Sequence, residues 1–203
     1  MTLTIPTWLT LARIALIPVL VVVYYLDHRW SNLAATVVFV AASVTDWLDG
    51  WIARRYRLSS KFGAFLDPVA DKLMVSTALV ITVQHHHTLW MALWASVIIG
   101  REIAVSALRE WMAELGLSAK VAVAMVGKVK TTVQMIALSF LLYREPLLGI
   151  PVFVLGEWLL AAAALLTLWS GFEYLRAAWP ALRADDAQTA DAKAGAKTVD
   201  IEK

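Results

Sequence analysis

Long apolar blocks dominate the sequence and restrict what it can fold into. Six blocks are separated by short polar segments, and each is close to the roughly 20 residues that a helix needs to cross a bilayer. Hydrophobic residues fill these blocks instead of forming one stripe, as expected for helices surrounded by lipid and by one another. The expected spans are residues 6–26, 33–56, 67–83, 89–112, 121–143 and 152–175. The sequence therefore predicts an all-α, polytopic membrane protein with six transmembrane helices.

Composition excludes several other classes of protein. Hydrophobic residues make up 60% of the chain and charged residues only 17%, against roughly 25% charged residues in an ordinary soluble domain. The absence of cysteine excludes disulfides and thiolate metal sites. A net charge of +2 is too small to indicate nucleic-acid binding. The first apolar run has no basic segment before it and contains Arg13, so we interpret it as a retained helix and not as a signal peptide.

Lysine and arginine are distributed unevenly between the connections. The turn between the third and fourth spans has the histidines 85–87 and no Lys or Arg, and the other odd-numbered turns have one Arg each. The connection between the second and third spans is basic, with Arg54, Arg55, Arg57 and Lys61. Because basic loops stay in the cytoplasm, we expect both termini there. The membrane domain is expected over residues 1–180, followed by a polar, disordered cytoplasmic tail over residues 181–203.

Four aspartates interrupt the apolar pattern near one end of the second and third spans. Asp46 and Asp49 are three residues apart, and Asp67 and Asp71 are four apart, so each pair shares one helix face. The short connection makes the two helices antiparallel neighbours, which brings the pairs to similar depth. Ionisable residues in a membrane span are costly and usually functional. The alternatives are helix-end charges, or the ion sites of an ion-coupled transporter.

Crowded carboxylates of this kind favour binding of hard divalent cations. Four carboxylates in low dielectric repel one another unless cations neutralise them, and oxygen ligands suit Mg²⁺ or Mn²⁺. Paired metals held by carboxylates are a known arrangement for phosphoryl transfer. Gly50 and Gly63 leave the backbone open to a nucleotide, and Arg54 is placed to hold phosphate oxygens.

The aspartate segment reads D-x2-D-G-x2-A-R-x8-G-x3-D-x3-D from Asp46 to Asp71. It resembles the signature of the CDP-alcohol phosphotransferase family at every fixed position. The resemblance implies a six-helix homodimeric enzyme in which an alcohol displaces CMP from a CDP-linked donor. It also implies that Asp46, Asp49, Asp67 and Asp71 bind two Mg²⁺ or Mn²⁺ ions, and that Asp71 is the general base.

The same resemblance implies a binding site for the CDP group of the donor, CDP-diacylglycerol. The first span contains Pro6-Thr-Trp-Leu-Thr10-Leu-Ala-Arg13, similar to the family pattern P-N-x-L-T-x-x-R, with Thr7 where asparagine is common. The implied contacts with the donor are Thr10, Arg13, Gly50, Ala53, Arg54, Ser60 and Gly63.

Further cations in the fourth and fifth spans indicate which acceptor is used. Several fixed cations suit an acceptor that carries a phosphate, such as glycerol 3-phosphate. The candidates are Arg101, Arg109, Lys128 and Lys130. Some of them are alternatively interpreted as positive-inside anchors.

Residues 3–178 are similar to bacterial family members that use glycerol 3-phosphate. The expected product is phosphatidylglycerol phosphate, with the active site facing the cytoplasm at the bacterial inner membrane. Family members that make cardiolipin or phosphatidylinositol phosphate remain alternatives, since their acceptors also carry a phosphate. The histidines 85–87 lie in the turn away from the aspartates, so we interpret them as a solvated loop.

Overall fold

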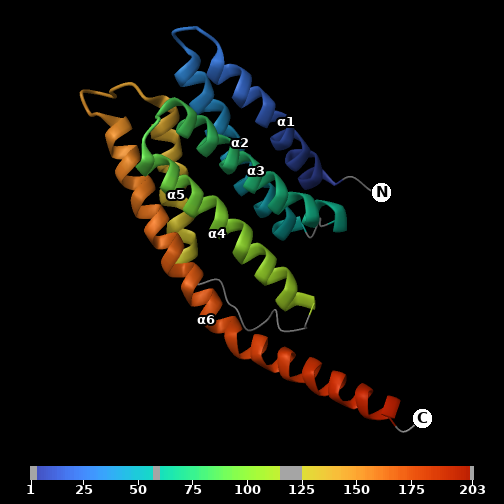
Figure 1. The fold of residues 1–203 in the computed structure, drawn as a ribbon. Coiled ribbons are helices and arrows are strands. Elements are labelled where there is room, and N and C mark those ends of the chain that lie inside the picture. The colour runs from blue at the N-terminus through green and yellow to red at the C-terminus, as the bar shows by residue number, and fades with distance from the viewer. Residues whose placement is uncertain (1–3, 57–59, 115–124, 202–203) are drawn as a thin grey trace.

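The computed structural model describes residues 4–56, 60–114 and 125–201, and in these ranges the chain is helical apart from short turns. Six helices pack side by side as a bundle (Figure 1). Their bounds are α1 Ile5–Tyr25, α2 Ser31–Tyr56, α3 Lys61–His85, α4 Leu89–Glu114, α5 Met125–Tyr143 and α6 Val152–Ile201. The all-α prediction is therefore confirmed, with one helix for each apolar block.

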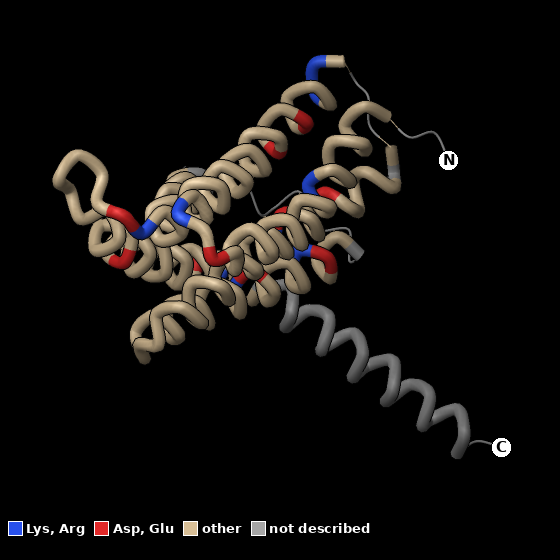
Figure 2. The backbone as a smooth tube through the Cα atoms, turned by 90° about the horizontal axis from the view of Figure 1, so that it is seen from above, with Lys and Arg blue, Asp and Glu red and all other residues tan. Residues whose placement is uncertain are grey.

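Within the residues that the structure describes, four helices are long and apolar enough to cross a membrane. They are α1, α2, residues Leu89–Ala113 of α4, and residues Val152–Arg176 of α6. In α5, the apolar stretch found among the described side chains is shorter and covers Val129–Tyr143. Positions occupied by Lys, Arg, Asp or Glu are sparse along the described part of the backbone (Figure 2). The chain is thus an integral membrane protein.

The third helix begins six residues before the span expected from its apolar residues. Ser60 is its N-cap, and the Ser60 hydroxyl accepts a hydrogen bond of 3.0 Å from the backbone N–H of Gly63. A serine in this position satisfies one of the free N–H groups of the first turn, which stabilises the helix start. Because of this cap, α3 starts before Asp67, so that Asp67 and Asp71 both lie inside the helix.

The end of the sixth helix differs from the sequence-based expectation. We expected a disordered tail after residue 180, whereas α6 continues as helix to Ile201. Alanine, the residue with the highest helix propensity, is frequent in this stretch, which accounts for the difference. The division of the chain into a membrane domain and a tail stays a prediction.

Small side chains allow the helices to pack closely. Ala78 of α3, Ala137 of α5 and Ala164 of α6 are fully buried in the core. At Gly156 of α6, an added Cβ would lie 3.0 Å from Leu141 Cγ and 3.2 Å from the Ala137 carbonyl oxygen of α5. Such close approach is how membrane helices gain packing energy when lipid is as apolar as their own side chains.

The turns that follow α1, α3 and α5 meet at one end of the bundle. Arg144, which follows α5 with φ 64°, donates to Asn32 Oδ1 at 2.5 Å and stacks over Tyr24 at 4.6 Å. It also hydrogen-bonds His85, and His86 stacks on Phe153 with ring centroids 4.4 Å apart. The histidine turn is therefore packed against neighbouring helices and is not a purely solvated loop. The opposite end holds the aspartates.

Candidate active site

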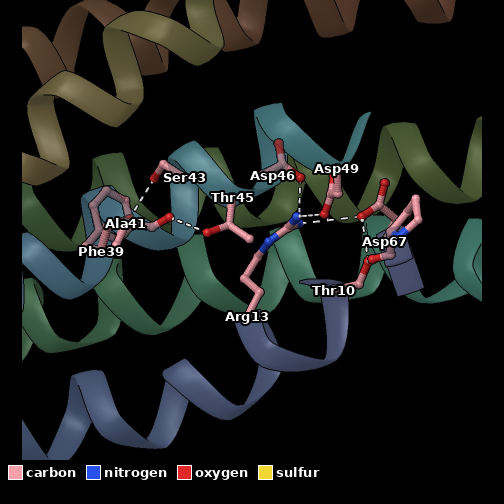
Figure 3. A network of polar contacts seen from close by, with 10 residues as sticks. Thr10, Arg13, Phe39, Ala41, Ser43, Thr45, Asp46, Asp49 and Asp67 are labelled. Carbon is pink, nitrogen blue, oxygen red and sulfur yellow. Dashed lines mark hydrogen bonds and ion pairs between the residues drawn. The ribbon is translucent and has the colours of Figure 1, made fainter. Parts of the chain in front are cut away.

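Three of the four aspartates converge on one arginine. The Arg13 guanidinium of α1, with 1% of its side chain exposed, pairs with Asp46 through Nη1 at 2.5 Å and with Asp49 through Nη2. Nη1 also lies 3.6 Å from Oδ1 of Asp67 on α3 (Figure 3). Arg13 therefore links three helices at one point, where the sequence predicted a contact with the CDP group.

The local helix geometry explains this convergence. Thr10 and Arg13 are three residues apart and share a face of α1, as Asp46 and Asp49 share a face of α2. The Thr10 hydroxyl donates to Oδ1 of Asp67 at 3.3 Å and to the Pro6 carbonyl at 3.0 Å. The polar faces of α1 and α2 thus meet the start of α3, and the contribution of α1 was not part of the prediction from the aspartate spacing.

The oxygen atoms of these three aspartates are suitable ligands for divalent cations. Carboxylate oxygens of Asp46, Asp49 and Asp67 lie within 4.8 Å of one another. A single guanidinium neutralises one of these three negative charges, so the group retains an excess of negative charge in a partly buried site. All the ligand atoms are hard oxygens, which Mg²⁺ and Mn²⁺ prefer.

Asp71 is one turn further along α3 and is outside that compact group. Its carboxylate interacts electrostatically with Asp46, Arg13 and Asp67, and also with Glu102 of α4. Lys130 of α5 interacts with both Asp71 and Glu102. Asp71 therefore interacts electrostatically both with the clustered aspartates and with a second group of charged residues on α4 and α5.

A pocket opens beside the aspartates, between the ends of α1, α2 and α3. It has a cavity volume of about 230 Å³. Six of the seven residues predicted to contact the CDP group line it, namely Thr10, Gly50, Ala53, Arg54, Ser60 and Gly63. The seventh, Arg13, pairs with Asp49, which also lines the pocket. Residues from three helices that are remote in sequence therefore form one cavity.

The pocket wall includes Thr7, a position at which this sequence departs from the family pattern. Thr7 is buried, and its hydroxyl hydrogen-bonds the hydroxyls of Ser60 at 3.0 Å and Thr4 at 2.9 Å. An added Cβ on Gly63 would lie 2.8 Å from Thr7 Oγ1 and 3.0 Å from Ser60 Oγ. Gly63 is thus required for the close approach of α1 and α3 at the pocket.

Arg54 folds back over Gly50 on the same helix. An added Cβ on Gly50 would lie 3.3 Å from Arg54 Nη1 and 3.6 Å from Nη2. The glycine therefore leaves space for a guanidinium at the pocket wall, where phosphate oxygens of a nucleotide are expected.

Two of the predicted acceptor cations share an aromatic partner. The guanidinium carbons of Arg101 and Arg109 on α4 lie 6.0 Å and 5.9 Å from the ring centroid of Tyr174 on α6. Arg101 Nη2 donates to Ser170 Oγ at 2.8 Å. Within the described residues, Arg101 Nε and the Tyr174 hydroxyl are buried without a hydrogen-bond partner. Both groups can donate a hydrogen bond, so both suit an anionic ligand.

A third acceptor cation, Lys130, is buried and paired. Its Nζ lies 3.3 Å from Oε1 of Glu102, and Nε2 of Gln134 donates to the same oxygen at 3.3 Å. Gln134 thus joins α5 to α4 through this hydrogen bond. Lys128 lies in α5, but its side chain is outside the described part of the structure.

Sequence reasoning missed several residues of these two groups. Glu102, which pairs with Lys130 at the centre of the second group, and Tyr174 are absent from the residues predicted from the sequence. A signal was available for Glu102, since a carboxylate inside an apolar span requires a cation. Nothing in the sequence indicates that Tyr174 faces α4.

The fold and the two charged groups define a class of membrane enzyme. The chain matches the family described as CDP-alcohol phosphatidyltransferase over residues 3–169, and it belongs to that family. It is therefore a CDP-alcohol phosphatidyltransferase, and the resemblance of the aspartate signature is confirmed.

Particular relatives are similar over most of their length. A protein of Escherichia coli strain K12 named CDP-diacylglycerol–glycerol-3-phosphate 3-phosphatidyltransferase is 55% identical over 174 residues, which are 86% of this chain and 94% of the relative. The protein of the same name from Shigella flexneri serotype 5b has the same identity and coverage. That from Sodalis glossinidius is 53% identical over 178 residues, 88% of this chain and 96% of the relative.

Proposed function

We propose that this chain transfers the phosphatidyl group of CDP-diacylglycerol to the primary hydroxyl of glycerol 3-phosphate. The products are phosphatidylglycerol phosphate and CMP. Support for the reaction comes from family membership and from the printed names of relatives at 53–55% identity. Support for the site comes from the pocket at the aspartates and from the cations of α4 and α5.

The observation that carries this proposal is that Asp71, one turn after Asp67 on α3, interacts electrostatically with two charged groups. One group is the aspartate cluster beside the pocket, and the other contains Glu102 and Lys130. A transferase needs its donor phosphorus and its acceptor hydroxyl at one place, with a base at their junction. Asp71 meets that requirement.

The donor site is assigned to the pocket lined by α1, α2 and α3. Gly50, Ala53 and Gly63 leave room for the nucleotide, and the remaining donor contacts are polar side chains: Thr10, Arg13, Arg54 and Ser60. Asp46, Asp49, Asp67 and Asp71 would hold two Mg²⁺ or Mn²⁺ ions. When bound, these ions neutralise the negative charge that develops on the diphosphate and on the departing CMP.

The acceptor site is assigned to the cations of α4 and α5. Arg101, Arg109 and Lys130 would bind the phosphate of glycerol 3-phosphate, with Lys128 as a fourth candidate. The unpartnered Arg101 Nε and Tyr174 hydroxyl give two further donors for the same phosphate. Glu102 keeps Lys130 oriented through the 3.3 Å contact.

The reaction then follows from these positions. Asp71 takes the proton from the primary hydroxyl of glycerol 3-phosphate, and the oxygen attacks the β-phosphorus of CDP-diacylglycerol. The new bond joins that oxygen to the β-phosphorus. The bond between the β-phosphorus and the bridging oxygen breaks, and the electron pair leaves with CMP. Arg54 and Arg13 are near enough to the pocket to orient the diphosphate during the transfer.

The proposal includes an arrangement in the membrane. All six helices cross the bacterial inner membrane, both termini are cytoplasmic, and the aspartates face the cytoplasm. Support comes from the basic residues at the aspartate end, including Arg54, Arg55 and Arg109. A homodimer is expected from the family resemblance.

A comparison of acceptors tests the proposed reaction. Purified protein in detergent is incubated with CDP-diacylglycerol, Mg²⁺ or Mn²⁺, and one acceptor, and CMP release is measured. We expect rapid release with glycerol 3-phosphate and little with inositol phosphate or phosphatidylglycerol. Faster release with either of the other acceptors would reassign the chain within its family. No release with any acceptor would favour a transporter.

A further inference from the structure

A tryptophan-lined groove lies at the end of the bundle away from the aspartates. It is formed by the first turns of α4 and α6 and has a cavity volume of about 420 Å³. Its lining consists of Trp90, Met91, Trp94, Glu157, Trp158 and Ala161. None of these residues belongs to the donor pocket or to the acceptor cations, so the proposed reaction gives the groove no role.

Three tryptophan side chains line the groove. Trp90 and Trp94 are one helical turn apart on α4, with ring centroids separated by 6.1 Å and planes 23° apart. Trp158 approaches from α6 and is 72% exposed. Indole faces carry the strongest negative electrostatic potential of the aromatic side chains, so several of them side by side attract cations.

Glu157 places a carboxylate in this aromatic groove. Among the residues that the structure describes, it has no hydrogen bond and no ion pair. Two arginines lie at this end of the molecule, and both are engaged elsewhere. Arg29 stacks over Trp30 at 5.1 Å, and Arg144 is held by Asn32 and Tyr24. The partly exposed Glu157 carboxylate is therefore available to pair with a positively charged ligand.

The depth of the groove matches that of lipid headgroups. Trp90 and Trp94 are the second and sixth residues of α4, and Glu157 is the sixth residue of α6. At 1.5 Å per residue, all of them lie within about 9 Å of a helix end. Tryptophan is also enriched at this depth in membrane proteins. A ligand of the groove therefore sits at the membrane interface.

We propose that this groove binds a phospholipid whose headgroup ends in an ammonium group, such as phosphatidylethanolamine. The ammonium lies against the indoles of Trp90 and Trp94 and pairs with Glu157, while the acyl chains stay in the bilayer. With the topology proposed above, this lipid belongs to the leaflet opposite the active site. A second copy of the chain is a less suitable occupant, because it would bury Glu157 without a described cation to pair with it.

The choice of lipid tests the proposal on the unmodified protein. Native mass spectrometry of the detergent-purified chain measures the retention of phosphatidylethanolamine, of phosphatidylglycerol with the same acyl chains, and of N-acetylated phosphatidylethanolamine. We expect phosphatidylethanolamine to be retained at least about fivefold more than the other two, since both lack the cation. Equal retention of the three lipids would overturn the proposal.

Variants locate the binding to the groove. Glu157→Gln and Trp94→Leu are each expected to lower phosphatidylethanolamine retention about fivefold, with CMP release unchanged. Glu173→Gln and Trp169→Leu, on exposed positions of α6 outside the groove, are the matched controls. Unchanged retention in Glu157→Gln would contradict the assignment. A loss of dimers in Glu157→Gln with unaltered phosphatidylethanolamine retention would also contradict it, because the groove would then be a contact between two copies of the chain.

Discussion

At the scale of single residues, Arg13 is a buried cation paired with several carboxylates. The Arg13 side chain is 1% exposed and forms ion pairs with Asp46, Asp49 and Asp67. The Asp49 side chain is almost as deeply buried, with 2% exposed. Removing one partner of a buried ion pair costs about 3–5 kcal/mol, because the remaining charge has no compensation. Arg13 is thus a counter-ion of the aspartates as well as a candidate donor contact.

Because Arg13 is a counter-ion of the aspartates, the stability of the Arg13→Gln variant should depend on added divalent cations. In chelator we expect a loss of about 3 kcal/mol, near the lower limit because Asp46 and Asp67 are each 42% exposed. Added Mg²⁺ or Mn²⁺ should restore more stability in the variant than in the wild type, since cations take over the neutralisation. Thermal unfolding in detergent measures both effects, with Arg29→Gln as the control. Equal metal responses would contradict the proposed metal site.

Asp71 carries the second prediction at this scale. Asp71→Asn keeps the shape of the side chain and removes its capacity to accept a proton. General-base catalysis contributes 10²–10⁴-fold, so CMP release should fall at least about 100-fold while binding of CDP-diacylglycerol is retained. Asp27→Asn, in the exposed turn after α1, is the matched control. Turnover close to that of the wild type would remove Asp71 from the role of base.

Individual site residues were predictable where the chemistry depends on local spacing. The distances along the chain from Asp46 to Asp71 identify the aspartates and the glycines, since i,i+3 and i,i+4 spacing puts them on one helix face. The link from Arg13 to these aspartates joins residues more than 30 positions apart. The contacts of Glu102 with Lys130 and of Arg101 with Tyr174 also depend on tertiary packing, which spacing alone does not encode.

At the scale of helices, the approach of α1 to α3 determines the shape of the donor pocket. Gly63 is the contact point, because Thr7 and Ser60 would lie 2.8 Å and 3.0 Å from an added Cβ. Neither side chain has the length to move aside without losing the hydrogen bond between their hydroxyls. The pocket is therefore sensitive to one methyl group at this position.

Gly63→Ala should accordingly weaken donor binding more than acceptor binding. We expect the KM for CDP-diacylglycerol to rise about tenfold, as α1 is displaced from α3, with the KM for glycerol 3-phosphate nearly unchanged. Gly100→Ala on α4 is the control, since an added Cβ there has nothing within 4 Å. Kinetics with each substrate varied in turn measure the two constants. Equal changes in both would point to general unfolding and not to the pocket.

The helices themselves were predictable to different degrees. Apolar blocks located α1, α2 and α4 to within about two residues, because lipid-exposed helices are apolar on every face. The start of α3 was missed by six residues, since Ser60 and Gly63 initiate it before the apolar stretch begins. The extension of α6 was missed because polar composition was interpreted as disorder, while alanine favours helix.

At the scale of the whole molecule, the two ends of the bundle differ in chemistry. The aspartates, the donor pocket and most basic residues lie at one end, and the histidine turn and the tryptophan groove lie at the other. This separation predicts the topology. The chain lacks cysteine, so single cysteines report their side of the membrane without interference.

Labelling of intact cells with a membrane-impermeant thiol reagent checks this topology. His87→Cys, in the turn before α4, should be labelled from outside, while Arg55→Cys, near the aspartates, should be labelled only after the membrane is permeabilised. Both positions are exposed, so accessibility within the protein is matched. The reverse pattern would place the active site outside and contradict the positive-inside assignment.

The most direct test of the central claim is the identity and amount of the lipid product. Purified protein is supplied with CDP-diacylglycerol, isotopically labelled glycerol 3-phosphate and Mg²⁺ or Mn²⁺, and the lipid product and CMP are quantified by mass spectrometry. The account predicts phosphatidylglycerol phosphate carrying the label, formed in equal amount to CMP, with both products reduced at least about 100-fold in Asp71→Asn. CMP formed without labelled lipid would show hydrolysis instead of transfer and would contradict the account.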